Sequence, residues 1–108
     1  GGGFIGLEIA ENLKHRKIDV IVIEKANQVM APIDYEMAAF VHEELKRRGV
    51  GLYLSADIEE VAELTDGSNK KIIKLVTGEV IETDMLIMSI GVKPESKLAK
   101  EINLELTV

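Results

Sequence analysis

The stretch GGGFIG at residues 1–6 constrains the fold more than any other feature of the sequence. Glycine tolerates tight turns and close backbone contacts that a Cβ atom forbids. The residues that follow are apolar at helical spacing: Ile5, Ile9, Ala10 and Leu13. We therefore expect a glycine-rich turn that leads directly into a helix from Ile5 to about His15.

Further strand and helix patterns follow this helix. The run from Asp19 to Glu24 is mostly apolar and ends in an acid, which is typical of a parallel strand covered on both faces. A helix is expected over Tyr35–Arg48, which Asp34 can cap and Gly49 can end. Val50–Leu54 is the next short strand. This alternation predicts an α/β fold with a Rossmann-like parallel sheet and helices on both faces.

The pattern changes after residue 56. The stretch 57–64 has some helix propensity, but regular spacing and turn residues at 66–69 favour a strand over Ile58–Leu64. Strands over Lys71–Val76 and Glu79–Thr83 then complete a three-stranded antiparallel β-meander.

The apolar segment Met85–Ile90, which ends on Gly91, is expected to be the last buried strand, and Ser96–Glu101 a short helix. A glycine turn of this kind normally follows the first strand of a sheet, and that strand is missing before Gly1. We expect it to come from apolar residues ahead of Gly1 in the natural protein. Without it, both neighbouring strands would expose unpaired backbone groups.

Composition excludes several classes of function. The 108 residues suffice for one domain, and a net charge of −6 argues against a nucleic-acid partner. The sequence contains no cysteine, which excludes a disulfide and a thiol nucleophile within these residues. His15 and His42 lie among charged residues on expected helices, so we expect solvated side chains and no metal site. No leader peptide or membrane-spanning run is recognisable, so a cytoplasmic protein with no membrane partner is expected.

The first six residues satisfy the pattern G-x-G-x-x-G, which suits the binding of a dinucleotide. Gly1 permits a tight turn, Gly3 lets the backbone approach a pyrophosphate, and Gly6 lets the helix pack closely on the sheet. The helix N-terminus adds free N–H groups and the positive end of the helix dipole, both of which favour an anion.

Glu24 lies 23 positions after Gly1, at the end of a strand. This spacing suits the acid that accepts hydrogen bonds from the adenosine ribose hydroxyls. A carboxylate there repels a 2′-phosphate, so NADH is expected as the cofactor and NADPH less so. Lys25 acts in the opposite sense if it turns inward toward a 2′-phosphate, whereas a solvated Lys25 leaves the preference for NADH intact.

Four stretches in this order resemble one family over nearly all of the chain: GGGFIGLEIAENL, VIVIEKANQVM, PIDYEMA and DMLIMSIGVKPES. They look like the NAD(H)-binding domain of the FAD-dependent pyridine nucleotide–disulfide oxidoreductases. Within that superfamily they are most similar to the branch of NADH oxidases, NADH peroxidases and coenzyme A-disulfide reductases. The resemblance implies that residues 1–108 are a single NAD(H)-binding domain of a larger flavoenzyme.

The resemblance also implies roles for individual residues. Phe4 matches a position that covers the nicotinamide pocket until NADH displaces it, and Glu8 matches an acid that holds the carboxamide. Glu8 could alternatively be stabilised by the helix dipole alone. Ile5 and Gly91 match backbone positions that line the bound dinucleotide, although Gly91 is also compatible with a plain turn. No residue of this chain matches a catalytic group.

In enzymes that the chain resembles, NADH reduces FAD, and electrons pass on to a disulfide such as coenzyme A disulfide, to peroxide or to dioxygen. Such an enzyme also needs parts that residues 1–108 do not match. These are the FAD site, the redox-active cysteine and the C-terminal interface domain of the parent homodimer. The chain alone is therefore not expected to complete a catalytic cycle. Two alternatives remain: a non-catalytic module that senses NADH or another adenine nucleotide, and a flavoenzyme of another branch that acts on a quinone or a ferredoxin.

Overall fold

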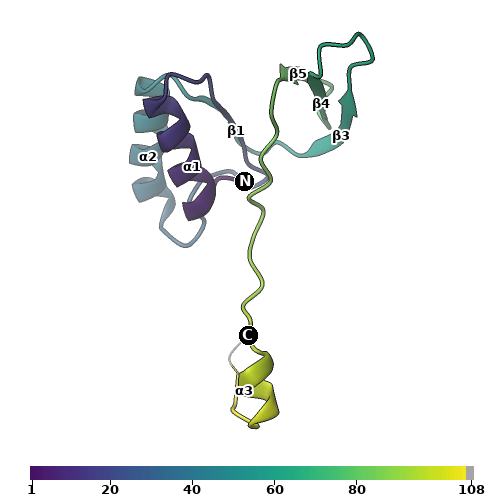
Figure 1. The fold of residues 1–108 in the computed structure, drawn as a ribbon. Coiled ribbons are helices and arrows are strands. Elements are labelled where there is room, and N and C mark those ends of the chain that lie inside the picture. Colours follow the sequence, from purple (N-terminus) through teal and green to yellow (C-terminus); the bar gives the residue numbers. More distant parts are fainter. Residues whose placement is uncertain (107–108) are drawn as a thin grey trace.

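The computed structural model describes residues 1–106 and forms an α/β fold, as predicted (Figure 1). The helices and strands run in the order α1 (Phe4–His15), β1 (Ile21–Ile23), α2 (Tyr35–Arg47), β2 (Gly51–Tyr53), β3 (Ile58–Glu63), β4 (Lys71–Leu75), β5 (Val80–Thr83) and α3 (Lys97–Glu101). Two sheets divide the strands. β1 and β2 are parallel, whereas β3, β4 and β5 form an antiparallel sheet in sequence order, which is the predicted meander.

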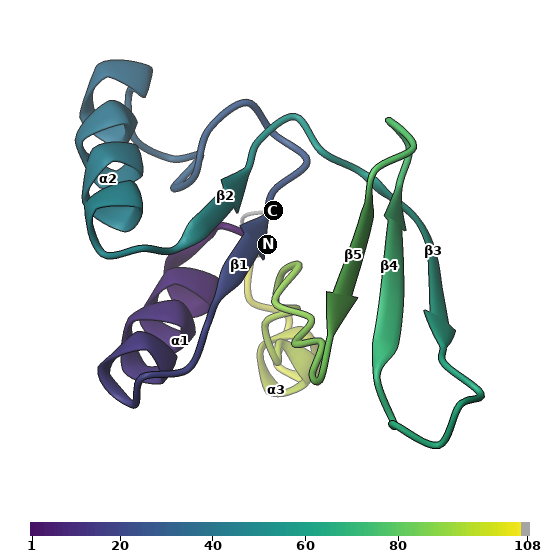
Figure 2. The same cartoon turned by 90° about the horizontal axis from the view of Figure 1, so that it is seen from above.

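The short parallel sheet lies between two layers (Figures 1 and 2). Both α1 and α2 cover one side of β1 and β2, and the three-stranded sheet lies on the other side. Side chains of the two parallel strands alternate accordingly, because successive residues of a strand point to opposite faces. Val22 and Leu52 pack in the cluster with Ala10 of α1, and Ile23 and Tyr53 pack against the meander. Helices were expected on both faces of the parallel sheet. Among the described residues, the face opposite α1 and α2 is covered by the strands of the meander instead.

The meander contains a cluster of deeply buried aliphatic residues. Leu75 is fully buried and shares one cluster with Ile73, Ile81 and Ala56. The pairing of β3 with β4 shifts register between Ile58 and Glu60, which marks a β-bulge near the start of β3. The aliphatic core is therefore divided into two clusters by the parallel sheet.

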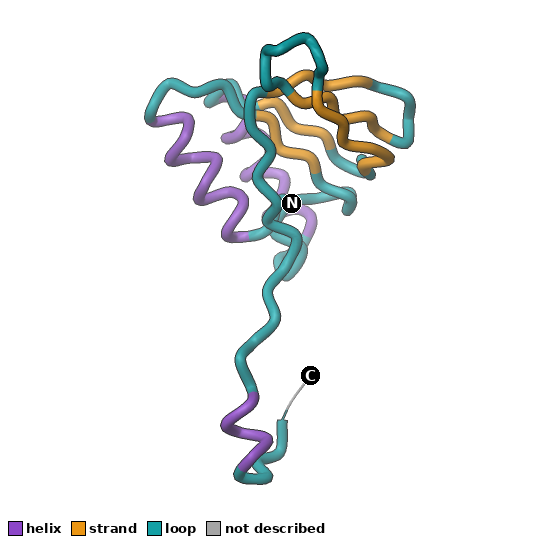
Figure 3. The backbone as a smooth tube through the Cα atoms, turned by 45° about the vertical axis from the view of Figure 1, so that its right-hand side comes forward, coloured by secondary structure: helices purple, strands orange, loops and turns teal. Residues whose placement is uncertain are grey.

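The backbone after β5 differs from the prediction. Met85–Ile90 does not form the expected buried strand, because none of the strands in residues 1–106 pairs with it and a strand needs a partner ladder. Met85 and Ile90 are 67% and 76% exposed. The segment instead runs past the N-terminus and away from the body toward α3 (Figure 3).

Two details of the helix ends also bear on the sequence predictions. Asp34 occupies the N-cap position of α2, but its side chain makes no capping hydrogen bond; its carbonyl accepts from the N–H of Met37 and of Ala38. Gly49 follows α2 with a φ of +72°, which confirms it as the glycine that ends the helix.

None of the helices in the described part of the chain has the length and apolar character needed to cross a membrane.

His42 is buried, contrary to the predicted solvated side chain. It is only 6% exposed, and its Nε2 accepts a hydrogen bond of 3.2 Å from the buried N–H of Val29. The ring also meets Tyr35 edge to face, with centroids 6.2 Å apart. His42 lies one helical turn after the fully buried Ala38, so helical spacing places it on the inner face despite its charged neighbours.

The contact between His42 and Val29 yields a stability prediction. His42→Leu leaves the Val29 N–H buried without an acceptor, so we expect the free energy of unfolding to fall by about 1–3 kcal/mol. His42→Gln keeps a carbonyl acceptor on the side chain and should lose less. Urea unfolding of both variants measures the difference, and equal losses would attribute the effect to packing alone.

Candidate functional site

The glycine turn leads into α1, and the first backbone N–H groups of this helix make no hydrogen bond within the helix. Gly3 is the N-cap residue, and the first helical hydrogen bond runs from Leu7 N to Gly3 O over 3.0 Å. The N–H groups of Phe4, Ile5 and Gly6 precede that bond, and such groups need partners from outside the helix. This end of α1 can therefore donate hydrogen bonds to an anion, as the sequence predicts.

Two glycines of the pattern have opposite surroundings. A Cβ atom on Gly6 would clash with the carbonyl oxygen of Gly1, so only glycine lets α1 approach the turn this closely. A Cβ atom on Gly3 would meet nothing within 4 Å, which leaves its backbone open to a ligand. Gly6 is therefore required for a close approach within the turn, and Gly3 borders open space.

The Glu24 carboxylate connects the end of β1 to the glycine turn. Its Oε2 accepts from Gly2 N over 2.6 Å, and its Oε1 accepts from Ala26 N over 2.8 Å. The backbone nitrogen of Gly1 donates a further hydrogen bond of 2.9 Å to the carbonyl of Ile23. The residue at the predicted ribose position therefore lies directly beside the glycine turn.

The same contacts set the charge state of Glu24. Burial raises its pKa, whereas the hydrogen bonds that the carboxylate accepts from the backbone of Ala26 and Gly2 lower it. The pKa therefore lies below its ordinary value of 4.5, and Glu24 is ionised at neutral pH. A carboxylate can accept about four hydrogen bonds, and the N–H groups of Gly2 and Ala26 supply two of them. The other acceptor positions are available to a ligand.

Lys25 points to an ion-pair partner. Its Nζ lies 2.6 Å from Oδ2 of Asp57, at the start of the meander. This hydrogen-bonded pair raises the pKa of Lys25 and lowers that of Asp57, so both side chains stay charged at neutral pH. The Lys25 side chain is 77% exposed, which agrees with the solvated alternative, and Asp57 is its ion-pair partner.

The remaining predicted residues lie around the same edge. Phe4 and Ile5 begin α1 and are 60% and 52% exposed, and Glu8 lies exposed one turn after Phe4. Gly91 has a φ of +129° and open space around its Cα, so a side chain there would be strained. It follows Ser89 and Ile90, which lie against Gly1.

Two residues near the turn escaped the sequence analysis. Gly2 occupies an unconstrained position of the glycine pattern, yet it is buried, and a Cβ atom there would lie 2.8 Å from Cγ1 of Val29. Ser89 donates a hydrogen bond of 3.2 Å from its Oγ to the Gly1 carbonyl, across nearly the whole length of the chain. Only a run of three glycines hinted at the first contact, and no sequence signal indicated the second.

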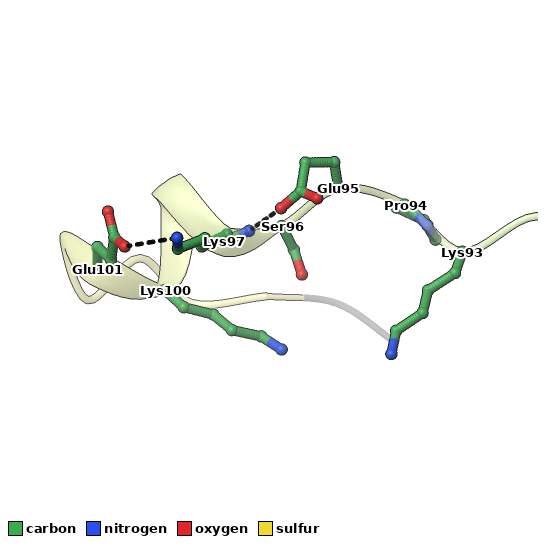
Figure 4. A pocket seen from close by; sticks show the side chains of 7 residues that line it. All are labelled: Lys93, Pro94, Glu95, Ser96, Lys97, Lys100 and Glu101. Carbon is green, nitrogen blue, oxygen red and sulfur yellow. Dashed lines mark hydrogen bonds and ion pairs between the residues drawn. The ribbon is translucent and has the colours of Figure 1, made fainter.

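A surface hollow lies elsewhere, around α3 (Figure 4). Its lining consists of Lys93, Pro94, Glu95, Ser96, Lys97, Lys100 and Glu101. Within it Lys97 pairs loosely with Glu101, at 3.9 Å between Nζ and Oε1. Because α3 stands well away from the glycine turn in Figure 1, this hollow takes no part in the candidate site. Among the described residues, no group of His, Asp and Glu side chains is arranged to hold a metal ion.

The lowered pKa of Glu24 predicts a pH-dependent stability. A carboxylate whose pKa is depressed by folding stabilises the protein fully above its unfolded value of about 4.5, and this contribution is lost as pH falls through the folded value. Glu24→Gln lacks this contribution. We therefore expect the free energy of unfolding to fall more between about pH 6 and pH 3 in the natural protein than in the variant. Parallel curves in chemical denaturation would contradict the role of these hydrogen bonds.

Comparison with known proteins finds oxidoreductases among the relatives of this chain. The chain is 39% identical over 102 residues to the NADH oxidase of Methanocaldococcus jannaschii, covering 94% of this chain and 22% of that protein. It is 52% identical to reduced CoADR-RHD of Bacillus anthracis, with a TM-score of 0.80, covering all of this chain and 18% of that one. The chain thus spans about a fifth of the length of these relatives.

A third relative has been solved with its nicotinamide cofactor. The water-forming NADH oxidase of Lactobacillus brevis, bound to NADH, is 30% identical with a TM-score of 0.78, over 94% of this chain and 22% of that one. An engineered variant of it, a water-forming NADPH oxidase bound to NADPH, is 28% identical with the same TM-score and coverage.

The family of pyridine nucleotide-disulphide oxidoreductases matches residues 1–108, which confirms the resemblance predicted from the four sequence stretches. Because this match runs from the first residue to the last, the protein is a member of the pyridine nucleotide-disulphide oxidoreductase family.

Proposed function

We propose that this chain is the NADH-binding domain of a flavin-dependent oxidoreductase and that NADH binds at the glycine turn. The observation that carries the proposal is the juxtaposition of the open Gly3 backbone, the free N–H groups of α1 and the ionised Glu24 carboxylate. NADH supplies a hydride to FAD in such enzymes. The part of this chain is to bind and orient the dinucleotide.

The adenosine half of NADH is assigned to the turn and to Glu24. The pyrophosphate would lie over Gly3, where no Cβ atom intervenes and the first N–H groups of α1 can donate to it. The adenosine ribose hydroxyls would donate to Glu24, whose oxygens keep acceptor positions beyond those used by Gly2 N and Ala26 N. Family membership supports this assignment, because the glycine turn belongs to the stretches that carry the resemblance.

The nicotinamide half is assigned to the exposed start of α1 and to Gly91. Phe4 would cover the nicotinamide pocket until the cofactor displaces it, and Glu8 would hold the carboxamide. Their exposure on one side of α1 is compatible with these roles. Ile5 and Gly91 would line the dinucleotide with their backbones.

A preference for NADH over NADPH follows from the charge of Glu24. The engineered NADPH oxidase carries an Asp-to-Ala change eighteen positions after a Gly-to-Ala change, with an Ala-to-Arg change at the next position. In this chain Glu24 lies eighteen positions after Gly6, and Lys25 follows it. This spacing supports Glu24 as the residue that disfavours a 2′-phosphate, and it marks Lys25 as the residue that acts in the opposite direction.

The electron acceptor and the partners belong to the whole enzyme. Relatives named NADH oxidase and coenzyme A disulfide reductase support dioxygen or a disulfide as the acceptor, and peroxide is the third acceptor that the family resemblance implies. Residues 1–108 would work with an FAD domain and a C-terminal interface domain, in a cytoplasmic homodimer. The chain's coverage of about a fifth of its relatives supports this division of labour.

Substitution of Gly3 tests the proposal. In Gly3→Ala the methyl group enters open space and φ is an ordinary −77°, so we expect stability to change by no more than about 0.5 kcal/mol. The same methyl group would block the pyrophosphate, so NADH affinity should fall by about tenfold or more, the equivalent of about 1.4 kcal/mol. Calorimetric titration with NADH, alongside a thermal melt, measures both quantities. Unchanged NADH affinity, or no binding of NADH to the unsubstituted protein, would refute the proposed site.

A further inference from the structure

The ion pair between Lys25 and Asp57 lies beside the proposed ribose position. Glu24 and Lys25 are consecutive, and the N–H of Ala56 donates to the Glu24 carbonyl over 3.0 Å. That backbone bond brings Asp57, the next residue, alongside Lys25. The Lys25 side chain is 77% exposed and that of Asp57 is 48% exposed, so solvent surrounds the pair and Lys25 is not fixed by packing.

Glu24 and Lys25 act in opposite directions on a 2′-phosphate. NADPH carries this doubly charged group at a ribose hydroxyl that Glu24 would otherwise bind, so Glu24 repels it. The ammonium group of Lys25 would attract it. Consecutive Cα atoms are about 3.8 Å apart, and the flexible four-carbon stem of Lys reaches further than that. A Lys25 released from Asp57 can therefore approach the group that Glu24 repels.

We propose that Asp57 is a specificity-determining residue that preserves the preference for NADH by holding the Lys25 ammonium group away from the 2′-phosphate position. This inference rests on the proposed function, because it needs a dinucleotide bound with its ribose at Glu24. It gives Asp57, just before β3, a role in cofactor selection. Asp57 belongs neither to the glycine turn nor to the strand end that carries Glu24.

The expected effect is modest because the pair is exposed. An exposed ion pair of this kind is worth at most about fivefold in an equilibrium constant. Loss of the Asp57 charge should therefore shift the ratio of the dissociation constants for NADPH and NADH about two- to fivefold in favour of NADPH. Asn retains the carbonyl oxygen that accepts from Ile58 N at 3.1 Å, so Asp57→Asn removes the charge with little change of shape.

The test is a double-mutant cycle on the whole chain, with NADH and NADPH as titrants. Asp57→Asn is compared with the unsubstituted protein, and Lys25→Gln with the double variant Lys25→Gln/Asp57→Asn. Asp57→Glu, which keeps the charge, is the matched control and should retain the original ratio. Thermal melts verify that each variant is folded before titration.

The inference predicts that Asp57→Asn shifts the ratio toward NADPH only when Lys25 is present. An equal shift in the Lys25→Gln background would show that Asp57 repels the phosphate directly, and an unchanged ratio in Asp57→Asn would show that the pair has no role in selection. Either result overturns the inference while NADH binding, and with it the proposed function, stands. Failure of the unsubstituted protein to bind NADH overturns both.

Discussion

The Glu24 carboxylate is the group on which the geometry of the candidate site depends. One oxygen accepts from Gly2 N ahead of α1, and the other accepts from Ala26 N in the loop after β1. A single side chain therefore fixes the glycine turn relative to the strand end. Removal of this acceptor leaves two backbone donors to find other partners, so structure and ligand affinity are coupled at this position.

The two-stranded parallel sheet supports that arrangement from both sides. Val22 turns toward the helices, and Ile23 turns toward the meander. Because the carbonyl of Ile23 also accepts from the backbone nitrogen of Gly1, the strand that organises both cores also positions the turn. The loop between β1 and α2 is fastened separately, where His42 of α2 accepts from Val29 N and the N–H of Met30 donates to Gly2 O. The strand β1, the loop that follows it and α2 thus all help to hold the glycine turn in place.

Most of the fold could be predicted because its signals are local. Glycine spacing and a strand-end acid located the turn and Glu24 within a few residues of sequence, and periodicity located both long helices. Contacts between distant residues were not predictable in this way. The partner of Lys25 at Asp57 joins two segments that no motif connects, and Ser89 reaches Gly1 from the far end of the chain. The segment Met85–Ile90 reads as a strand by composition, but pairing depends on a neighbour that lies outside its own sequence.

The most direct test of the account is a calorimetric titration of the protein and of Glu24→Ala with NADH and with NADPH. Any structural loss in the variant affects both cofactors alike, so the difference between them isolates the ribose contact. We expect the natural protein to bind NADH more tightly, and the variant to lose about 1–3 kcal/mol of NADH binding while NADPH binding falls less or improves. Equal losses for both cofactors, or tighter binding of NADPH by the natural protein, would contradict the assignment of Glu24.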